Sequence, residues 1–176
     1  VSVALYLGVA PGGRLQALGL RGWHSSIFLR TGAWLVMLLP AVMLIGGLTD
    51  FTFRMLEWDS RPQDLLGWLT TGTPAMRASL VLTAVVLAPI FEECFFRGTM
   101  QQAWEKICRP GVATGLTALL FAMSHAQLNI IPGLWAMGLI LERARRASGT
   151  LWLPILLHAG FNAVTLGLVW CFPGLQ

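Results

Sequence analysis

The fold is decided by residues 78–97, which read ASLVLTAVVLAPIFEECFFR. The first fourteen of these residues carry no charge, whereas the last six hold two glutamates and an arginine. An apolar stretch that opens in this way fits a helix crossing a lipid bilayer, which needs about 20 residues. Charged side chains inside such a helix are costly, so Glu92, Glu93 and Arg97 require an explanation.

The composition of the whole chain points to the same class. Of the 176 residues, 56% are hydrophobic and 11% are charged, whereas an average soluble domain has about 45–50% and about 25%. Despite the net charge of +4, these values fit a soluble domain, a disordered chain or a nucleic-acid-binding protein poorly. The three cysteines show no metal-ligand spacing, and their odd number argues against a disulfide framework.

We therefore predict an all-α fold, a polytopic transmembrane bundle that forms a single membrane-embedded domain over residues 1–176. About five spans are expected, with the motif-bearing core at about 78–172, and their bounds are Thr31–Leu48, Ala78–Trp104, Val112–Ala126, Asn129–Glu142 and Thr150–Phe172. Val1–Ala10 is apolar but too short to cross a bilayer, and it reads as the tail of a truncated span or an interfacial start. Asp50–Arg77 is expected to be a wet stretch, either an amphipathic interfacial segment or a surface loop.

The loop charges predict the orientation of the bundle. Nine Lys and Arg fall on the side that holds residues 11–30, 97–109 and 143–149, against three on the other side. The positive-inside rule places the first side in the cytoplasm. We expect an integral membrane protein, with the lipid bilayer around it, of the bacterial inner membrane. Because turns on the cytoplasmic side join the motif helices, we expect an aqueous crevice that opens there.

Polar side chains inside the predicted spans are few. Glu93 and Arg97 are spaced i,i+4, so they can pair on one helix face, in the simplest case as a structural ion pair. Glu92 is then rotated by about 100° and lacks a partner in its own helix. It lies 16 residues before Cys108, at the turn, and His125 lies 17 residues after it. At about 1.5 Å per residue both reach a similar depth, so we predict that His125 is the partner of Glu92.

His158 and Asn162 form a second i,i+4 pair, which shares one face of the last span. A hydrogen bond that only joins two helices is the plain interpretation of this pair. The set Glu92, His125, His158 and Asn162 also suits hydrolysis of a peptide bond by an activated water. Glu92, bonded to His125 or sharing a water with it, would take the proton, and the N–H groups of His158 and Asn162 would hold the oxyanion.

Other catalytic types are less well supported by the residues. Ser124 lacks a nucleophile-elbow setting, and nothing marks Cys94 as an activated thiol. The zinc motif HExxH is absent, but Glu92, His125 and His158 would satisfy a three-ligand catalytic zinc site. The residues therefore leave a metal-dependent and a metal-free mechanism open.

Three motifs in order carry a family resemblance: Glu92-Glu93-x-x-x-Arg97-Gly98, Phe121-x-x-x-His125 and His158-x-x-x-Asn162. With the lead-in segments Ala17–Arg21 and Gly149–His158, the chain resembles the CPBP family of CAAX-processing and bacteriocin-immunity (Abi) intramembrane endopeptidases, and within it CAAX prenyl protease 2-like proteins. Glu142, which is followed by three arginines, departs from the family pattern, in which this segment is commonly small and apolar.

The resemblance implies that Glu92 is the catalytic base and that Glu93 with Arg97 is its supporting pair. His125 would help to activate water, and His158 with Asn162 would bind the oxyanion or complete the polar site. The family is described both as metalloproteases and as metal-free glutamate enzymes. The resemblance therefore implies either no cofactor or a divalent metal such as zinc.

The expected function is an intramembrane endopeptidase acting on a membrane-associated peptide or protein. The substrate classes are a lipidated CAAX-like tail, a bacteriocin precursor and a C-terminal sorting signal, and nucleic acid is not an expected partner. The alternative is a non-catalytic membrane scaffold or immunity module that binds a partner through the same polar pocket. A small transporter that relays protons is a third hypothesis, and no inverted repeat in the sequence supports it.

Overall fold

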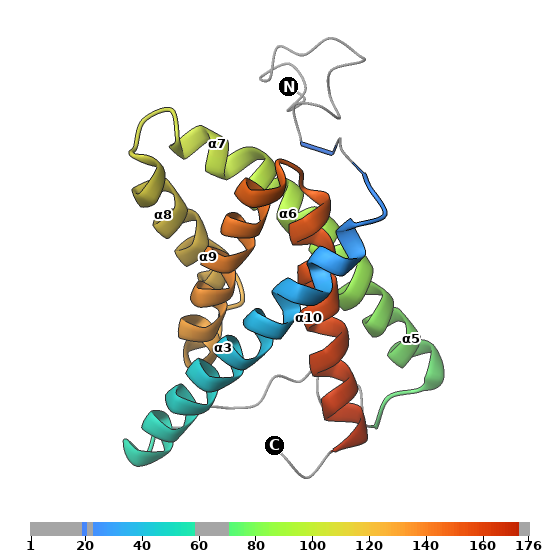
Figure 1. Ribbon diagram of the computed structural model, residues 1–176. Coiled ribbons are helices and arrows are strands. Elements are labelled where there is room, and N and C mark those ends of the chain that lie inside the picture. The colour runs from blue at the N-terminus through green and yellow to red at the C-terminus, as the bar shows by residue number, and fades with distance from the viewer. Residues whose placement is uncertain (1–18, 21–22, 59–70, 173–176) are drawn as a thin grey trace, which may run out of the picture.

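The computed structural model describes residues 19–20, 23–58 and 71–172, and within these ranges it contains helices and their connections but no strand. Figure 1 shows the arrangement. In chain order the elements are α3 (Ile27–Met55), α5 (Pro74–Leu82), the π-helical turn η1 (Thr83–Leu87), α6 (Ala88–Phe95), the π-helical turn η2 (Phe96–Met100), α7 (Gln101–Trp104), α8 (Pro110–Met123), the 3₁₀ turn η3 (Leu128–Ile130), α9 (Ile131–Ser148) and α10 (Trp152–Cys171). The predicted all-α fold class is confirmed.

Elements α5 to α7 form one long helix, Pro74–Glu105, interrupted only by the two π turns. The helix starts at Pro74, which has no N–H to leave unsatisfied, and the hydroxyl of Thr73 accepts a bond from the backbone N–H of Met76 at 3.3 Å. Three helices in the described part of the chain, α3, α5–α7 and α10, are long and apolar enough to cross a membrane. Helix α8 is apolar but has 14 residues, and α9 carries four charged side chains in its C-terminal half.

Several predicted helix boundaries are wrong, among them the ends of α3 and α9. Helix α3 runs to Met55 rather than ending at Leu48, so Asp50 lies on a helix instead of in a wet loop. The hydroxyls of Thr49 and Thr52 bond to carbonyls one turn earlier, which satisfies them without ending the helix. Helix α9 runs to Ser148, because it stops at Gly149, whose φ of +69° only glycine adopts readily, and not at the arginine run.

Two other predictions lie outside the described residues. These are the apolar start at Val1–Ala10 and the middle of the interfacial segment expected between Asp50 and Arg77, of which residues 59–70 are not described.

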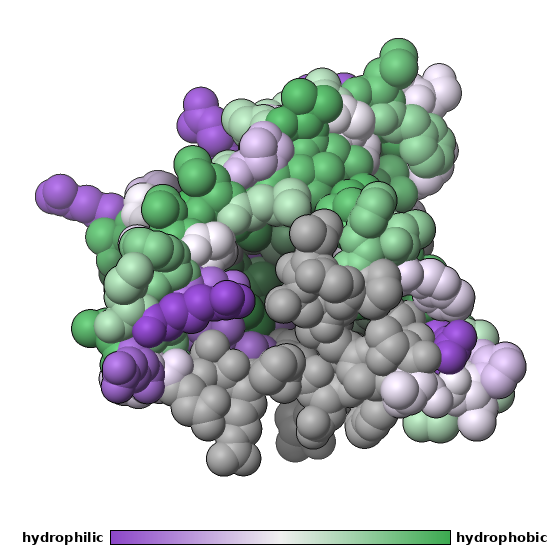
Figure 2. All heavy atoms as spheres, turned by 90° about the horizontal axis from the view of Figure 1, so that it is seen from below, coloured by the Kyte–Doolittle hydropathy of each residue, from purple (hydrophilic) through white to green (hydrophobic). Residues whose placement is uncertain are grey.

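The apolar core lies where α3 crosses α9 and α10 (Figure 1). Its fully buried members are Leu38 from α3, Met137, Leu141 and Ala144 from α9, and Leu153 and Leu157 from α10. Large apolar side chains also cover the outside of the helices, for example Leu29 and Val36 of α3, and Figure 2 shows them over much of the visible surface. Such an exposed apolar surface suits a lipid environment, since a soluble monomer rarely carries one.

Candidate active site

The predicted pair of Glu93 and Arg97 forms in the middle of the bundle. Arg97 Nη1 donates to Glu93 Oε1 at 2.9 Å, and the two side chains are 1% and 0% exposed. Arg97 Nη2 donates to the carbonyl of Gly138 on α9 at 3.2 Å. A Cβ at Gly138 would lie 2.9 Å from Cβ of Ala118 and 3.3 Å from Arg97 Nη2, so the site depends on a glycine there. The guanidinium also lies 4.6 Å from the ring centre of Phe121, a cation–π contact.

His158 is held by the same carboxylate. Its Nδ1 lies 3.0 Å from Glu93 Oε1, and the side chain is buried. An ionised carboxylate only accepts hydrogen bonds, so Nδ1–H is the donor, and in the neutral ring Nε2 carries the lone pair. Nε2 lies 3.9 Å from Glu92 Oε2, too far for a direct hydrogen bond but suited to a bridging water. Glu93 therefore orients the imidazole, and Glu92 faces its other nitrogen.

Glu92 differs from Glu93 in exposure, as the 100° rotation predicts. Its side chain is 29% exposed and lines the main pocket of the described structure. Its Oε2 is buried and has no hydrogen-bond partner among the described residues. Glu92 is thus a carboxylate that can meet a water or a substrate.

His125 does not bond to Glu92, so the predicted direct contact is wrong. Its Nδ1 lies 3.0 Å from the carbonyl of Phe121, and its ring packs against the Phe121 ring with centres 5.1 Å apart. The depth argument assumed a helix through Ala126, but α8 ends at Met123, and Ala126 has a φ of +53°. His125 therefore sits on a turn, yet it lines the same pocket as Glu92, which leaves the shared-water arrangement.

Asn162 shares the pocket with His158, as the i,i+4 spacing predicts. Its Nδ2 donates to the carbonyl of Ala84 at 2.7 Å. Ala84 belongs to the π turn η1, and π turns are frequent at functional sites because they displace backbone groups from the regular pattern. One amide hydrogen of Asn162 therefore joins α10 to the long helix, and the second is left for another acceptor.

The pocket encloses about 720 Å³. Four of its lining side chains are those predicted as catalytic, Glu92, His125, His158 and Asn162, and the others are mainly apolar or small: Met76, Ser79, Leu80, Thr83, Ala84, Ala88, Ile130, Leu134, Thr165 and Leu166. A largely apolar cavity with a few converging polar groups is the usual form of a ligand site.

The pocket extends in a direction that the sequence did not predict. From the level of Glu92 it runs along the start of α5, the start of α9 and the second half of α10. These parts lie at the end of the bundle opposite to α7 and the start of α8 (Figure 1). These lining residues therefore do not form the crevice that was expected at the Arg-rich end.

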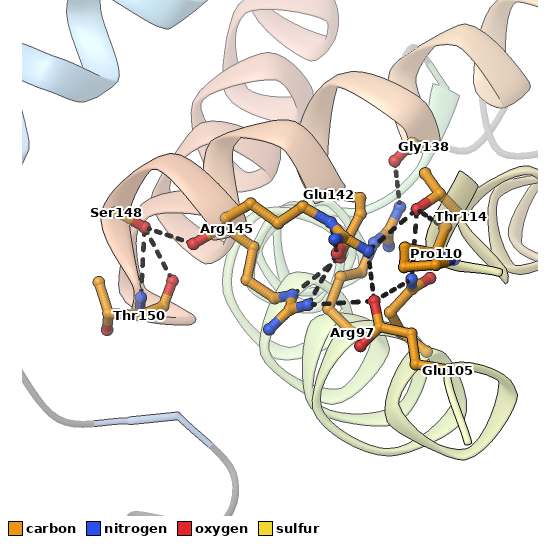
Figure 3. A network of polar contacts seen from close by, with 11 residues as sticks. Arg97, Glu105, Pro110, Thr114, Gly138, Glu142, Arg145, Ser148 and Thr150 are labelled. Atoms are coloured by element: carbon orange, nitrogen blue, oxygen red, sulfur yellow. Dashed lines mark hydrogen bonds and ion pairs between the residues drawn. The ribbon is translucent and has the colours of Figure 1, made fainter.

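The Arg-rich end is instead occupied by a second polar cluster, drawn in Figure 3. Glu142 accepts bonds from Arg145 at 2.7 and 2.8 Å and from Arg146 at 2.8 Å, and Arg146 also contacts Glu105. The hydrogen bonds that Arg145 donates to Glu142 are the main cause that raises the pKa of Arg145. We call Glu105, Glu142, Arg145 and Arg146 the rim cluster. Glu142, which departs from the family pattern, is thus the buried centre of a local ion-pair network.

The candidate metal ligands do not form a ligand set. Among the described residues, no three His, Cys, Asp or Glu side chains are grouped so that they could hold a metal ion. His125 and His158 both use Nδ1 for hydrogen bonds within the protein.

Three features of the site were missed by the sequence reasoning. Phe121 contacts the rings of His125 and His158 and the guanidinium of Arg97, and its place four residues before His125 was the available signal. Gly138 could have been suspected only from the close packing of α8 and α9. The carbonyl of Ala84 carries no sequence signal, because it depends on the π turn.

Comparisons with known proteins identify the family of this chain. The family model of the type II CAAX prenyl endopeptidases, Rce1-like, matches residues 74–164, just over half of the chain. An "Uncharacterized 24.3 kDa protein" of Escherichia coli is 40% identical over 94 residues, 51% of this chain and 42% of that protein. The chain thus spans less than half the length of this relative. No solved structure matches the chain significantly. Since the matched segment holds all three motifs in order, the chain belongs to the type II CAAX prenyl endopeptidase Rce1-like family.

Proposed function

We propose that this protein is an intramembrane endopeptidase that hydrolyses a peptide bond with a water activated by Glu92. The observation that supports this most is the shared pocket, in which Glu92, His125, His158 and Asn162 meet although they come from three separate segments. The buried contacts of Glu93 with Arg97 and His158 fix the position of the His158 side chain in this arrangement. The Rce1-like family membership supports the same reaction class.

In the proposed reaction, a water lies between Glu92 and Nε2 of His158. Glu92 takes one proton of the water, and the oxygen attacks the carbonyl carbon of the scissile bond. The tetrahedral intermediate then collapses: the C–N bond breaks, and the proton held by Glu92 passes to the leaving amine. His158 orients the water through Nε2, since Glu93 fixes its Nδ1–H.

Oxyanion stabilisation in this proposal is shared by Asn162 and His125. Asn162 has a second amide hydrogen besides the one bonded to Ala84. His125 uses Nδ1 at the carbonyl of Phe121, so Nε2 is the atom it offers to the pocket, as a donor when the ring is charged. Donors of this kind typically contribute about 3–4 kcal/mol to the transition state.

The substrate class follows from the pocket and the family. Its lining is mainly apolar, so we propose a membrane-associated chain as substrate, with a lipidated CAAX-like tail as the first candidate and a bacteriocin precursor or a C-terminal sorting signal as the others. The test uses purified protein in detergent and a farnesylated CAAX peptide reporter.

The Glu92→Gln variant is expected to lose cleavage by about 10²–10⁴-fold while it still folds, because the base is removed and the shape is kept. Glu57→Gln, at an exposed position next to the end of α3, is the matched control and should cleave at the wild-type rate. Cleavage by Glu92→Gln at the control rate would refute the mechanism. If wild-type protein cleaves none of the three substrate classes but binds one of them, the scaffold or immunity alternative is favoured.

The proposed orientation places the Arg-rich end in the cytoplasm of the bacterial inner membrane. Two native cysteines test it, because Cys108 lies in the turn after α7 and the exposed Cys171 ends α10. A thiol reagent that does not cross membranes should label Cys108 in inverted vesicles and Cys171 in spheroplasts. The reverse pattern would mean that the pocket extends towards the cytoplasm instead.

A further inference from the structure

The long helix carries a polar ladder that continues beyond the two residues the proposed mechanism uses. Glu93, Arg97, Gln101 and Glu105 follow at intervals of four, so they occupy one face of the helix. Gln101 is completely buried, and its Nε2 donates to Glu105 Oε1 at 2.8 Å and to the hydroxyl of Thr114 at 3.2 Å. The ladder therefore runs from the centre of the bundle to the rim cluster.

Several atoms along this ladder are buried and lack a hydrogen-bond partner among the described residues. They are Arg97 Nε, Gln101 Oε1, Glu93 Oε2 and the hydroxyl of Thr117 on α8. The three ladder side chains are at most 1% exposed, and Thr117 is 2% exposed. Buried polar groups in native proteins are almost always paired with protein or ordered water, so four such atoms in one region need an explanation.

Thr117 lies on α8 between two residues that contact the ladder. It lies one turn from Thr114, which bonds to Gln101, and one turn from Phe121, whose ring lies against the guanidinium of Arg97. Thr117 is therefore level with the gap between Gln101 and Arg97. The atoms alternate between types, since Gln101 Oε1 accepts, the Thr117 hydroxyl donates and accepts, Arg97 Nε donates and Glu93 Oε2 accepts.

We propose that a file of ordered water molecules between η2–α7 and α8 bridges Gln101, Thr117 and Arg97 and ends at the carboxylate of Glu93. A water that makes two to four bonds to such groups is the usual content of a polar interior site. The π turn η2, which contains Arg97, lies at the same level, and a π turn widens the helix locally.

The file gives the proposed hydrolysis a second source of water, and this part of the inference rests on the proposed function. The pocket runs from Glu92 to the end of the bundle opposite to the rim cluster, so an apolar substrate in the pocket excludes water from that side. The file approaches the site from the side of the rim cluster and ends at the carboxylate of Glu93, which holds His158. Arg97 stays charged, so the route passes water and repels hydronium.

The test uses a water-sized probe and needs no enzyme activity. In full-length protein with Cys94, Cys108 and Cys171 replaced by alanine, Thr117→Cys places a thiol in the proposed file. Ala113→Cys is the matched control, because Ala113 is also fully buried on α8 and lies nearer the Arg-rich end. The probe is Ag⁺, and its reaction is read by mass spectrometry as the loss of maleimide labelling after denaturation.

We expect the thiol of Thr117→Cys to react at least about tenfold faster than that of Ala113→Cys, and Gln101→Leu to abolish the difference. Equal rates at the two positions would overturn the proposal. If the cysteine variants do not fold, the native chain with ¹⁵N-labelled glutamine answers the same question. Magnetisation transfer from water to the Gln101 side-chain amide is expected, and its absence overturns the file.

The kinetic consequence is tested separately on the farnesylated CAAX peptide. Gln101→Leu should lower kcat about tenfold and leave KM unchanged, since it restricts water and does not touch the pocket, and Gln101→Asn should restore part of kcat. A raised KM with unchanged kcat would contradict this role of the file. If the wild-type protein does not cleave the peptide, that result bears on the proposed function, whereas the Ag⁺ and NMR results still decide whether the file exists.

Discussion

The centre of the bundle and the rim cluster are built from the same chemical groups but are arranged in opposite ways. At the centre, one buried carboxylate, Glu93, serves both Arg97 and His158. At the rim, one buried carboxylate, Glu142, is held by Arg145 and Arg146, whose side chains are 21% and 41% exposed. The arginines of the rim are partly exposed to bulk solvent, whereas Glu93 and Arg97 at the centre are not. Incompletely paired buried charges therefore lie at the candidate active site, and fully paired charges lie at the partly exposed rim.

The largest effect is expected from breaking the centre. Arg97→Leu removes the cation that compensates Glu93 and should lower the free energy of unfolding by about 3–5 kcal/mol, since an uncompensated buried charge remains. Chemical unfolding in detergent, followed by tryptophan fluorescence, measures the change. The double variant Arg97→Leu with Glu93→Leu should recover much of the loss. No recovery would mean that the two residues do not act as a pair.

A smaller effect is expected from crowding the centre. Gly138→Ala places a methyl group against Ala118 and Arg97 and should cost about 1–3 kcal/mol through overpacking. Gly115→Ala on α8 is the matched control, because no atom lies within 4 Å of its Cβ, and it should be neutral or slightly stabilising. The same unfolding measurement compares the two variants. Equal effects would show that α8 and α9 do not meet closely at Gly138.

Removing the hydrogen bond of Asn162 should cost about 1 kcal/mol. Asn162→Ala breaks the contact with the carbonyl of Ala84, which joins α10 to the π turn. Thr165→Ala, one turn further along α10, is the control, because its hydroxyl bonds only to carbonyls of its own helix. In the proposed mechanism Asn162→Ala also slows cleavage of the farnesylated peptide, whereas the exposed control Glu57→Gln does not. Equal cleavage rates would remove Asn162 from the oxyanion role.

The smallest effect is expected at the rim. Arg145→Gln should change the free energy of unfolding by less than about 1 kcal/mol, because the pair is partly exposed and Arg146 still reaches Glu142. High salt should reduce this difference further. The pKa of Arg145 is raised, mainly by its hydrogen bond to Glu142, so its contribution is fully present below the ordinary pKa of arginine. Unfolding at pH 6 and at pH 9 should therefore show the same difference between Arg145→Gln and wild type.

Local spacing along a helix was predicted correctly from the sequence. Glu93 pairs with Arg97, and His158 shares a pocket with Asn162, since residues four apart on a helix lie on one face. The apolar composition also predicted the all-α class correctly, because this class follows from the polarity of the side chains along the chain. The predicted ends of α3, α8 and α9 were wrong, whereas the ends at Trp104 and Phe172 were predicted to within one residue.

The sequence by itself determined that the chain forms apolar helices with a few charged groups inside them and that Glu93 pairs with Arg97. These properties depend on side-chain polarity and on the fixed period of the α-helix. Only the tertiary structure decided that His158 joins Glu93, that Asn162 reaches a π turn and that the pocket extends away from the Arg-rich end. Those features depend on how separate helices cross and where each one ends, and no spacing within a single helix contains that information.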